Sequence, residues 1–248
     1  MTDLGATALV AGGAGVVCAS GAGAWLASPV VARRLAVRRL AAHCAATGAV
    51  ALTYDDGPGA DLTPRLLDRL AQADARATFF LLGRRAERAQ AVADAVHDAG
   101  HEIGCHSREH LNAWKTAPAR AVADVAAGFE ALGRWLGERP IFRPPYGKIT
   151  PWTARAVRAR GARLGWWTVD SGDTWPETPE PEQVAGRVER AGGGVVLLHD
   201  FDRAGENAED RAAFVLGVTA AILDLARRRG WRLAPMGALL DEMEADRR

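Results

Sequence analysis

The feature that most constrains the fold is a regular alternation of strand-like and helix-like segments from Ala49 to the C-terminus. Seven such units in a row, with no second domain between them, predict an α/β fold whose parallel sheet closes towards a barrel rather than staying open. In either arrangement, ligands bind at the carboxyl ends of the strands. Short apolar runs predict strands at residues 49–54, 77–82, 102–105, 141–143, 163–169, 194–199 and 231–233. Amphipathic runs predict helices at residues 63–73, 84–99, 118–136, 153–160, 182–190 and 210–229.

Composition agrees with a single globular domain, because 248 residues with 48% hydrophobic and 25% charged side chains can bury a full core. The formal net charge of +1, from 31 basic and 30 acidic residues, gives no electrostatic reason to expect a nucleic-acid partner. Cys18, Cys44 and Cys105 are odd in number and lack CxxC spacing. They therefore indicate neither a disulfide framework nor a thiolate zinc site.

The N-terminal segment, residues 1–45, differs from the rest of the chain. It carries no charge between Asp3 and Arg33 and is rich in Ala, Gly, Val and Leu. The run is long enough to cross a hydrocarbon core, which needs about 20 residues. Its many glycines leave a soluble or surface-lying helix as the alternative. We predict an apolar, membrane-associated segment over residues 1–45, followed by a globular domain over residues 46–248.

Charges on either side of the apolar run bear on topology. Asp3 precedes the run, and arginines follow it at positions 33, 34, 38 and 39, the reverse of a secretory signal. The positive-inside rule then predicts that the globular domain lies in the cytoplasm, with export as the alternative. These arginines are either a lipid-facing basic flank or a solvated helix face.

Two predicted strands end in residues suited to metal binding. The strand at 49–54 is followed by Asp55 and Asp56 and then by a Gly-Pro turn, and the strand at 102–105 is followed by His106 and His110. Asp-Asp-Gly alone is most often a turn, and two histidines four residues apart often occur by chance on a surface helix. Histidines four apart on a helical turn nevertheless point to one side, where they and a carboxylate could bind zinc or another divalent transition metal. Cys105 should face the other side of its strand.

Three further strand ends carry polar groups. Arg143 precedes Pro-Pro-Tyr-Gly and could serve as the counter-charge of the Asp pair, unless it is a solvated loop residue. Asp170 and Asp173 follow the fifth strand, and His199 ends the sixth. A histidine there can act as a general acid, and either aspartate could hold its tautomer and raise its pKa.

Taken in order, these segments resemble the five motifs of the polysaccharide deacetylase family, the NodB-like, metal-dependent carbohydrate esterases. The resemblance covers Ala49 to the C-terminus and implies a distorted (β/α) barrel of about seven units that hydrolyses N-acetyl groups on amino sugars. Residues 46–248 would then be the catalytic domain. The segments that carry the resemblance are Thr53–Pro58, His106–His110, Arg143–Gly147, Asp170–Trp175 and Leu198–Asp200.

Position by position, the resemblance implies that Asp55 is the catalytic base and that Arg143 orients it. Tyr146 would supply a backbone N–H to the oxyanion, and His199 would be the general acid. The implied cofactor is one divalent ion, with zinc expected and cobalt, nickel and manganese as alternatives. Its implied ligands are Asp56, His106 and His110.

Two positions depart from the family pattern. Tyr54 stands where Phe is usual, and Thr174 separates Asp173 from Trp175, which leaves open whether Asp170 or Asp173 supports His199. Members act on chitin oligomers, peptidoglycan or acetylated xylan, and some deacylate or deformylate lipid-linked sugars at the cytoplasmic membrane face. A carbohydrate is therefore the expected partner, and a catalytically inactive glycan-binding barrel is the alternative. Candidates for stacking against sugar are Trp114, Trp166, Trp167 and Trp175, with either Trp166 or Trp167 expected in the core.

Overall fold

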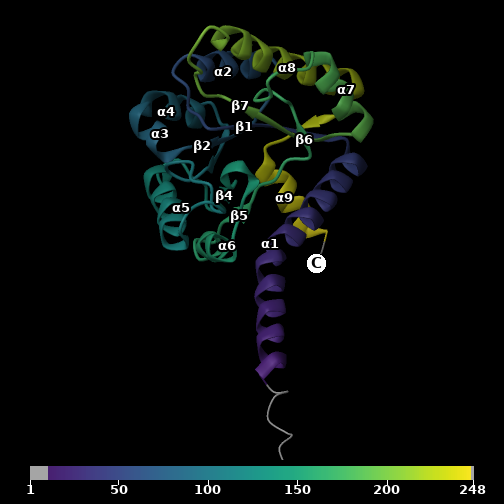
Figure 1. Ribbon diagram of the computed structural model, residues 1–248. Coiled ribbons are helices and arrows are strands. Elements are labelled where there is room, and N and C mark those ends of the chain that lie inside the picture. The colour runs from purple at the N-terminus through teal and green to yellow at the C-terminus, as the bar shows by residue number, and fades with distance from the viewer. Residues whose placement is uncertain (1–10, 247–248) are drawn as a thin grey trace, which may run out of the picture.

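A single parallel sheet organises the computed structural model, which describes the backbone of residues 11–246 and the side chains of residues 29–246. The strand order is β5-β4-β3-β2-β1-β7-β6, and β8 pairs with the first residues of β1. The sheet curls into an incomplete barrel whose terminal strands, β5 and β6, are not paired with each other (Figure 1). The predicted distorted barrel is thereby confirmed. The strands are β1 (Ala49–Asp55), β2 (Thr78–Leu81), β3 (Glu102–Cys105), β4 (Ile141–Phe142), β5 (Arg163–Leu164), β6 (Val169–Asp170), β7 (Gly194–His199) and β8 (Arg232–Leu233).

The predicted strand at 163–169 is wrong as a single element. It is two short strands on opposite edges of the sheet, β5 beside β4 and β6 beside β7. Residues 165–168 connect the two edges. A Cβ on Gly165 would approach Phe80, Ile141 and Met236 to about 3 Å, so close packing at this crossing favours glycine.

The six predicted helices are present, but one of them is divided in two, and the structure has further helices that were not predicted. The run at 84–99 is divided at Ala89, whose φ of −123° and ψ of 50° are not helical. Helix α9, whose first residues Met236, Gly237 and Leu239 are buried, was not predicted. The helices are α1 (Ala11–Thr47), α2 (Leu62–Gln72), α3 (Gly83–Arg88), α4 (Gln90–Asp98), α5 (Pro118–Leu132), η1 (Pro145–Gly147, 3-10), α6 (Pro151–Arg158), α7 (Pro181–Ala191), α8 (Ala208–Arg229) and α9 (Met236–Ala245).

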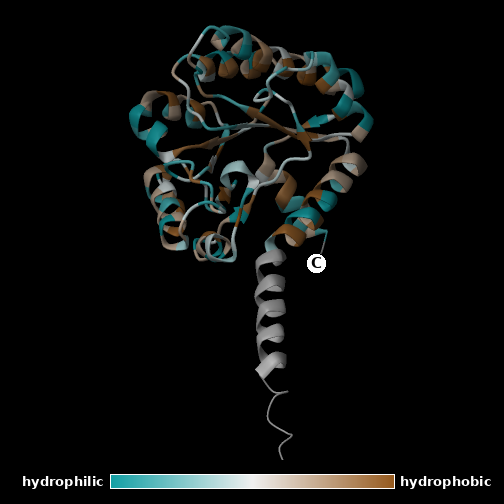
Figure 2. Ribbon diagram, viewed as in Figure 1, coloured by the Kyte–Doolittle hydropathy of each residue, from teal (hydrophilic) through white to brown (hydrophobic). Residues whose placement is uncertain are grey.

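The core has two layers because side chains alternate across the strands. On β1, Val50, Leu52 and Tyr54 pack into the outer layer against the surrounding helices. Ala49 and Ala51 face the inner layer. The apolar faces of the outer helices turn towards the sheet, and their hydrophilic faces turn away (Figure 2).

Helices α1 and α9 fill the inner layer. Leu40 and Cys44 of α1 are 2% and 0% exposed and share a cluster with Val195 and Leu239. Burying an aliphatic side chain of this size typically contributes about 2 kcal/mol. The last part of α1 is therefore packed on the barrel, and the predicted division between residues 45 and 46 falls inside this helix.

Of the predicted membrane segment, residues 1–10 lie outside the described residues, and residues 11–28 are described by their backbone alone, as part of α1. Among the helices whose residues are described, none has the length and apolar character needed to cross a membrane. The two cysteines in this part of the chain, Cys44 and Cys105, are both buried and unpaired. Burial raises the pKa of the Cys105 thiol to about 12.

Candidate active site

The two adjacent aspartates at the end of β1 point to different partners. Asp55 is the last residue of the buried strand, and Asp56 has a φ of 71°, in the left-handed region that aspartate tolerates better than most residues. The backbone therefore turns between them. Asp55 faces the barrel interior and Arg143, whereas Asp56 faces His106 and His110.

Within the described residues, Asp56, His106 and His110 form a group of side chains that could hold a metal ion, and their potential ligand atoms all lie within 4.8 Å of one another. Asp56 Oδ1 lies 3.4 Å from His106 Nε2 and 3.1 Å from His110 Nε2. This oxygen is buried and has no hydrogen-bond donor. A buried acceptor without a donor, facing two imidazole nitrogens, fits a divalent cation.

Both imidazole rings are in a neutral state that can bind a metal ion. His106 Nδ1 lies 2.7 Å from the carbonyl oxygen of Arg143, which can only accept a proton, so Nε2 keeps its lone pair for a metal. Burial lowers the pKa of His106 to about 3 and also lowers that of His110, despite the nearby Asp56 carboxylate. Neither ring has to lose a proton at neutral pH before it binds metal.

The expected helical turn between the two histidines is wrong. Residues 106–110 form a loop in which Ser107 and His110 have φ values of 67° and 62°. Asp124 of α5 holds this loop by accepting the backbone N–H groups of Glu109 and Leu111 at 2.7 and 3.2 Å. The two histidines converge because the loop folds back on itself, and a periodicity in the sequence does not predict such a loop.

Arg143 and Asp55 form a buried ion pair. Arg143 Nη1 donates to Asp55 Oδ1 at 2.7 Å and to Thr53 Oγ1 at 2.8 Å, and its guanidinium lies 4.0 Å from the centre of the Phe80 ring. Burial raises the pKa of Asp55, while Arg143 opposes the rise. A carboxylate that is held in place but is more basic than in water suits proton abstraction near neutrality.

His199 and Asp173 form a second pair, and this contact decides which aspartate supports the histidine. Asp173 Oδ1 accepts from His199 Nδ1 at 2.9 Å, and Asp173 Oδ2 accepts the backbone N–H of His199 at 2.9 Å. Asp170 instead accepts the backbone N–H of Gly172. Burial alone would lower the pKa of His199, but the charge and hydrogen bond of Asp173, together with the charges of Asp55 and Asp56, outweigh burial and raise the pKa to about 9.

Two arginines beside the site were not predicted. Arg203 Nη2 lies 3.5 Å from Asp173 Oδ2, and Arg85 donates to the backbone oxygen of Asp56 at 2.7 Å. Arg203 and His199 therefore both lie beside the Asp173 carboxylate, and Arg85 stabilises the backbone turn that directs the Asp56 side chain towards the two histidines. Arg85 lies in a predicted helix and Arg203 in a polar loop, so neither stood at a strand end, where site residues were sought.

Aromatic residues border the site. Tyr146 has a φ of 57°, and its ring lies 4.4 Å from that of His110, centre to centre. Trp114 and Trp175 are about half exposed, as sugar-stacking residues must be. Trp166 is buried, and Trp167 is partly exposed, in agreement with the expectation that one of the pair belongs to the core.

Comparison with known proteins places this geometry in context. The family model described as polysaccharide deacetylase matches residues 42–165. A peptidoglycan-N-acetylglucosamine deacetylase of Bacillus cereus is 32% identical over 77% of this chain and 87% of its own length. A chitooligosaccharide deacetylase of Azorhizobium caulinodans is 29% identical over 75% of this chain and 91% of its own. The crystal structure of a peptidoglycan N-acetylglucosamine deacetylase with a bound N-hydroxybenzamide superposes with a TM-score of 0.68 and 28% identity, covering 78% of this chain and 88% of that one.

Proposed function

The chain belongs to the polysaccharide deacetylase family, and from this we propose that it removes N-acetyl or other N-acyl groups from amino sugars of a glycan or glycoconjugate. The observation that carries the proposal is the convergence of two units at one edge of the sheet. One is the Asp56, His106 and His110 cluster, and the other is the Asp55–Arg143 pair. His199 on β7 stands beside β1 in register with Asp55, so an acid and a base face the same space.

We propose one zinc ion at Asp56, His106 and His110, because two imidazoles and a carboxylate suit zinc and leave positions open. When bound, a divalent ion there would acidify water and polarise the acyl carbonyl. Cobalt, nickel and manganese remain alternatives, since imidazole and carboxylate ligands accept each of them.

The residues of the chain supply the proton transfers. Asp55 takes the proton of the water that attacks the amide carbon, and Arg143 fixes the orientation of that carboxylate. The Tyr146 N–H stabilises the oxyanion, and a donor of this kind is typically worth about 3 kcal/mol. As the C–N bond breaks, His199 gives its proton to the departing nitrogen, which leaves a carboxylic acid and a free amino sugar. Asp173 keeps the His199 ring in position through Nδ1.

Two substrate classes are supported by relatives: peptidoglycan and chitooligosaccharides are the substrates that their names give. The half-exposed rings of Trp114 and Trp175 could stack on sugar faces of either polymer. The test is mass spectrometry of N-acetyl and N-formyl amino sugars that are free, polymeric or lipid-linked, after incubation with wild type and with His199→Ala. Acyl loss with wild type alone supports the proposal. A wild-type protein that carries its metal, binds the sugars and releases no acyl group is instead the inactive glycan-binding barrel.

We also propose that the protein associates with a membrane through its N-terminal segment, with the catalytic domain in the cytoplasm. The support is the uncharged run between Asp3 and Arg33 and the arginines that follow it. Fractionation of cells, with protease added outside intact cells, tests both parts. A soluble protein contradicts the association, and digestion of the domain in intact cells contradicts the topology.

A further inference from the structure

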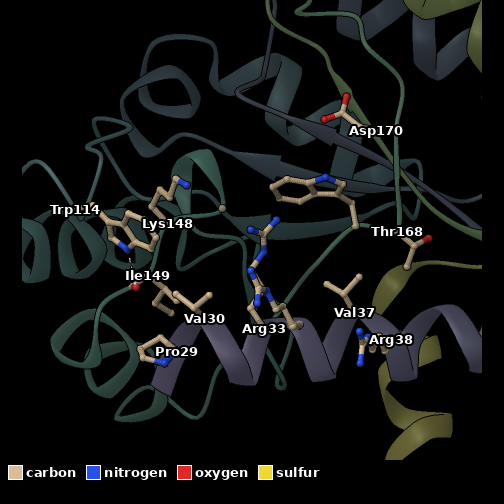
Figure 3. A pocket seen from close by; sticks show the side chains of 13 residues that line it. Pro29, Val30, Arg33, Val37, Arg38, Trp114, Lys148, Ile149, Thr168 and Asp170 are labelled. Carbon is tan, nitrogen blue, oxygen red and sulfur yellow. Dashed lines mark hydrogen bonds between the residues drawn. The ribbon is translucent and has the colours of Figure 1, made fainter. Parts of the chain in front are cut away.

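A cavity of about 620 Å³ opens between α1 and the segments that follow β4 and precede β6 (Figure 3). One wall is α1, whose lining residues 29–38 precede the stretch that the family model matches. The other wall is built from Trp114, the loop at 147–149 and residues 167–170. The cavity therefore combines an element outside the family match with loops at the catalytic edge of the sheet.

The cavity is strongly basic. Arg33, Arg34, Arg38 and Lys148 line it together with one acidic residue, Asp170. Within the described part of the chain, none of these four cations lies in an ion pair. Lys148 lies 4.3 Å from the centre of the Trp114 ring, a cation–π contact that leaves its ammonium free to bind an anion. Arg33 and Lys148 are partly buried, and Arg34 and Arg38 are exposed, so four cations without a carboxylate ion pair among the described residues line one cavity, which favours an anionic ligand.

Arg33 is partly buried in this cavity, whereas the sequence had predicted a side chain that is solvated or faces lipid. Its guanidinium carbon lies 5.2 Å from the ring centre of Trp166 and 5.0 Å from that of Trp167, and its Nε is buried without a hydrogen-bond acceptor. Figure 3 shows the side chain rising from α1 into the cavity. Partial burial of an arginine that has no acceptor is costly unless a ligand supplies one.

The cavity is next to the catalytic centre. A Cβ on Gly147 would lie 3.1 Å from Arg33 Nη2, so the guanidinium lies close to the residue that follows Tyr146. Tyr146 in turn packs on His110 of the metal cluster. A sugar whose N-acyl group is at the metal cluster could therefore extend its next substituent past Tyr146 into the basic cavity.

We propose that this cavity binds the phosphate of a phosphate-linked amino sugar while the N-acyl group of that sugar is at the catalytic centre, an inference that rests on the function proposed above. Arginine forks match phosphate oxygens in pairs, and four cations exceed what one sugar carboxylate would neutralise. Val30, Val37 and Ile149 line the same cavity and offer apolar surface to the group beyond the phosphate. That group is either a nucleoside or a polyprenyl chain.

The kinetic test compares kcat/KM for a neutral N-acetylated chitooligosaccharide with that for nucleoside-diphosphate and short polyprenyl-diphosphate N-acetylglucosamine. The variants are Arg34→Gln/Arg38→Gln and the control Arg39→Gln, an exposed arginine of the same helix that does not line the cavity. We expect wild type to prefer a phosphate-linked substrate. The double variant should lower the ratio of phosphate-linked to neutral kcat/KM by about ten-fold or more, and Arg39→Gln should leave it unchanged.

A binding test separates this inference from the proposed function. Calorimetry with N-acetylglucosamine 1-phosphate on His106→Ala, which removes a metal ligand, should show binding that weakens about ten-fold on adding Arg34→Gln/Arg38→Gln. The proposal is overturned if His106→Ala binds the sugar phosphate equally well with and without Arg34→Gln/Arg38→Gln. It is also overturned if adding Arg39→Gln to His106→Ala weakens binding as much as adding Arg34→Gln/Arg38→Gln does. Preference of wild type for N-acetylmuramic oligomers over phosphate-linked sugars also overturns it, because the anion would be a carboxylate. If phosphate binds at the arginines and no substrate is deacylated, the proposed function fails and the anion site stands.

Discussion

Replacing Asp173 with Asn tests the acid side of the proposed mechanism. The buried Asp173 carboxylate holds His199 through Nδ1 and is the main group that opposes burial, so that the pKa of His199 is raised to about 9. Asparagine keeps the shape and one acceptor oxygen but removes the charge. With the charge gone, burial still lowers the pKa of His199 and only Asp55 and Asp56 still raise it, so the pKa falls from about 9 towards the ordinary value of about 6.5.

The magnitude follows from the fraction of His199 that is protonated. At pH 8 this fraction is about 0.9 for a pKa of 9 and about 0.03 for a pKa of 6.5, so the loss in the variant is at most about 30-fold. At pH 6 the two fractions are about 1.0 and 0.8. A general acid must be protonated to act, so activity is lost as pH rises through its pKa, and the variant should lose activity at lower pH than wild type.

The assay is the pH dependence of kcat/KM for the metal-loaded enzyme, whose alkaline limb reports the free-enzyme acid. We expect the limb to move down by about two pH units in Asp173→Asn. A bound ion acts on both proteins alike, so the shift between them is the measured quantity. Asp170→Asn is the matched control, since Asp170 accepts the backbone N–H of Gly172 and its change should leave the limb in place. A limb that stays fixed in Asp173→Asn, or moves equally in Asp170→Asn, refutes the assignment.

Two further predictions concern the base and the packing of α1. Asp55→Asn should keep the metal and lose about 100-fold or more in turnover, whereas Asp56→Asn should lose metal affinity and regain some activity with added metal. If metal analysis shows that Asp55→Asn loses the metal and Asp56→Asn keeps it, then Asp55 is the metal ligand and Asp56 the base. Leu40→Ala should lower the free energy of unfolding in urea by about 2–5 kcal/mol, because Leu40 is fully packed against the inner layer. Leu35→Ala on the same helix, 48% exposed, should change it by less than about 0.5 kcal/mol, and equal losses would show that α1 is not part of the folded domain.

The sequence predicted those site residues that stand at strand ends. Asp55, Arg143 and His199 follow apolar runs, and parallel strands bring such ends to one edge, so their convergence could be inferred without coordinates. The choice between Asp170 and Asp173 could not be made, since both follow the same strand and only the turn at Gly172 brings Asp173 to His199.

Features set by loops and by packing were beyond the sequence. The loop that folds His110 back onto Asp56 depends on two positive φ values and on Asp124 from a later helix. The split of residues 163–169 between two sheet edges depends on the open seam of the barrel. The contacts of Arg33 with the rings of Trp166 and Trp167 join residues about 130 positions apart, and sequence periodicity does not predict such contacts.

The central claim is that one divalent ion at Asp56, His106 and His110 serves an N-deacetylation reaction. Its most direct test is to strip the protein of metal, add zinc in steps and measure acetate released from an N-acetylated chitooligosaccharide. We expect acetate release to rise linearly until about one equivalent per chain and to stay near background in His110→Ala. Acetate release that is independent of zinc, or that is equal in His110→Ala and wild type, would contradict the claim.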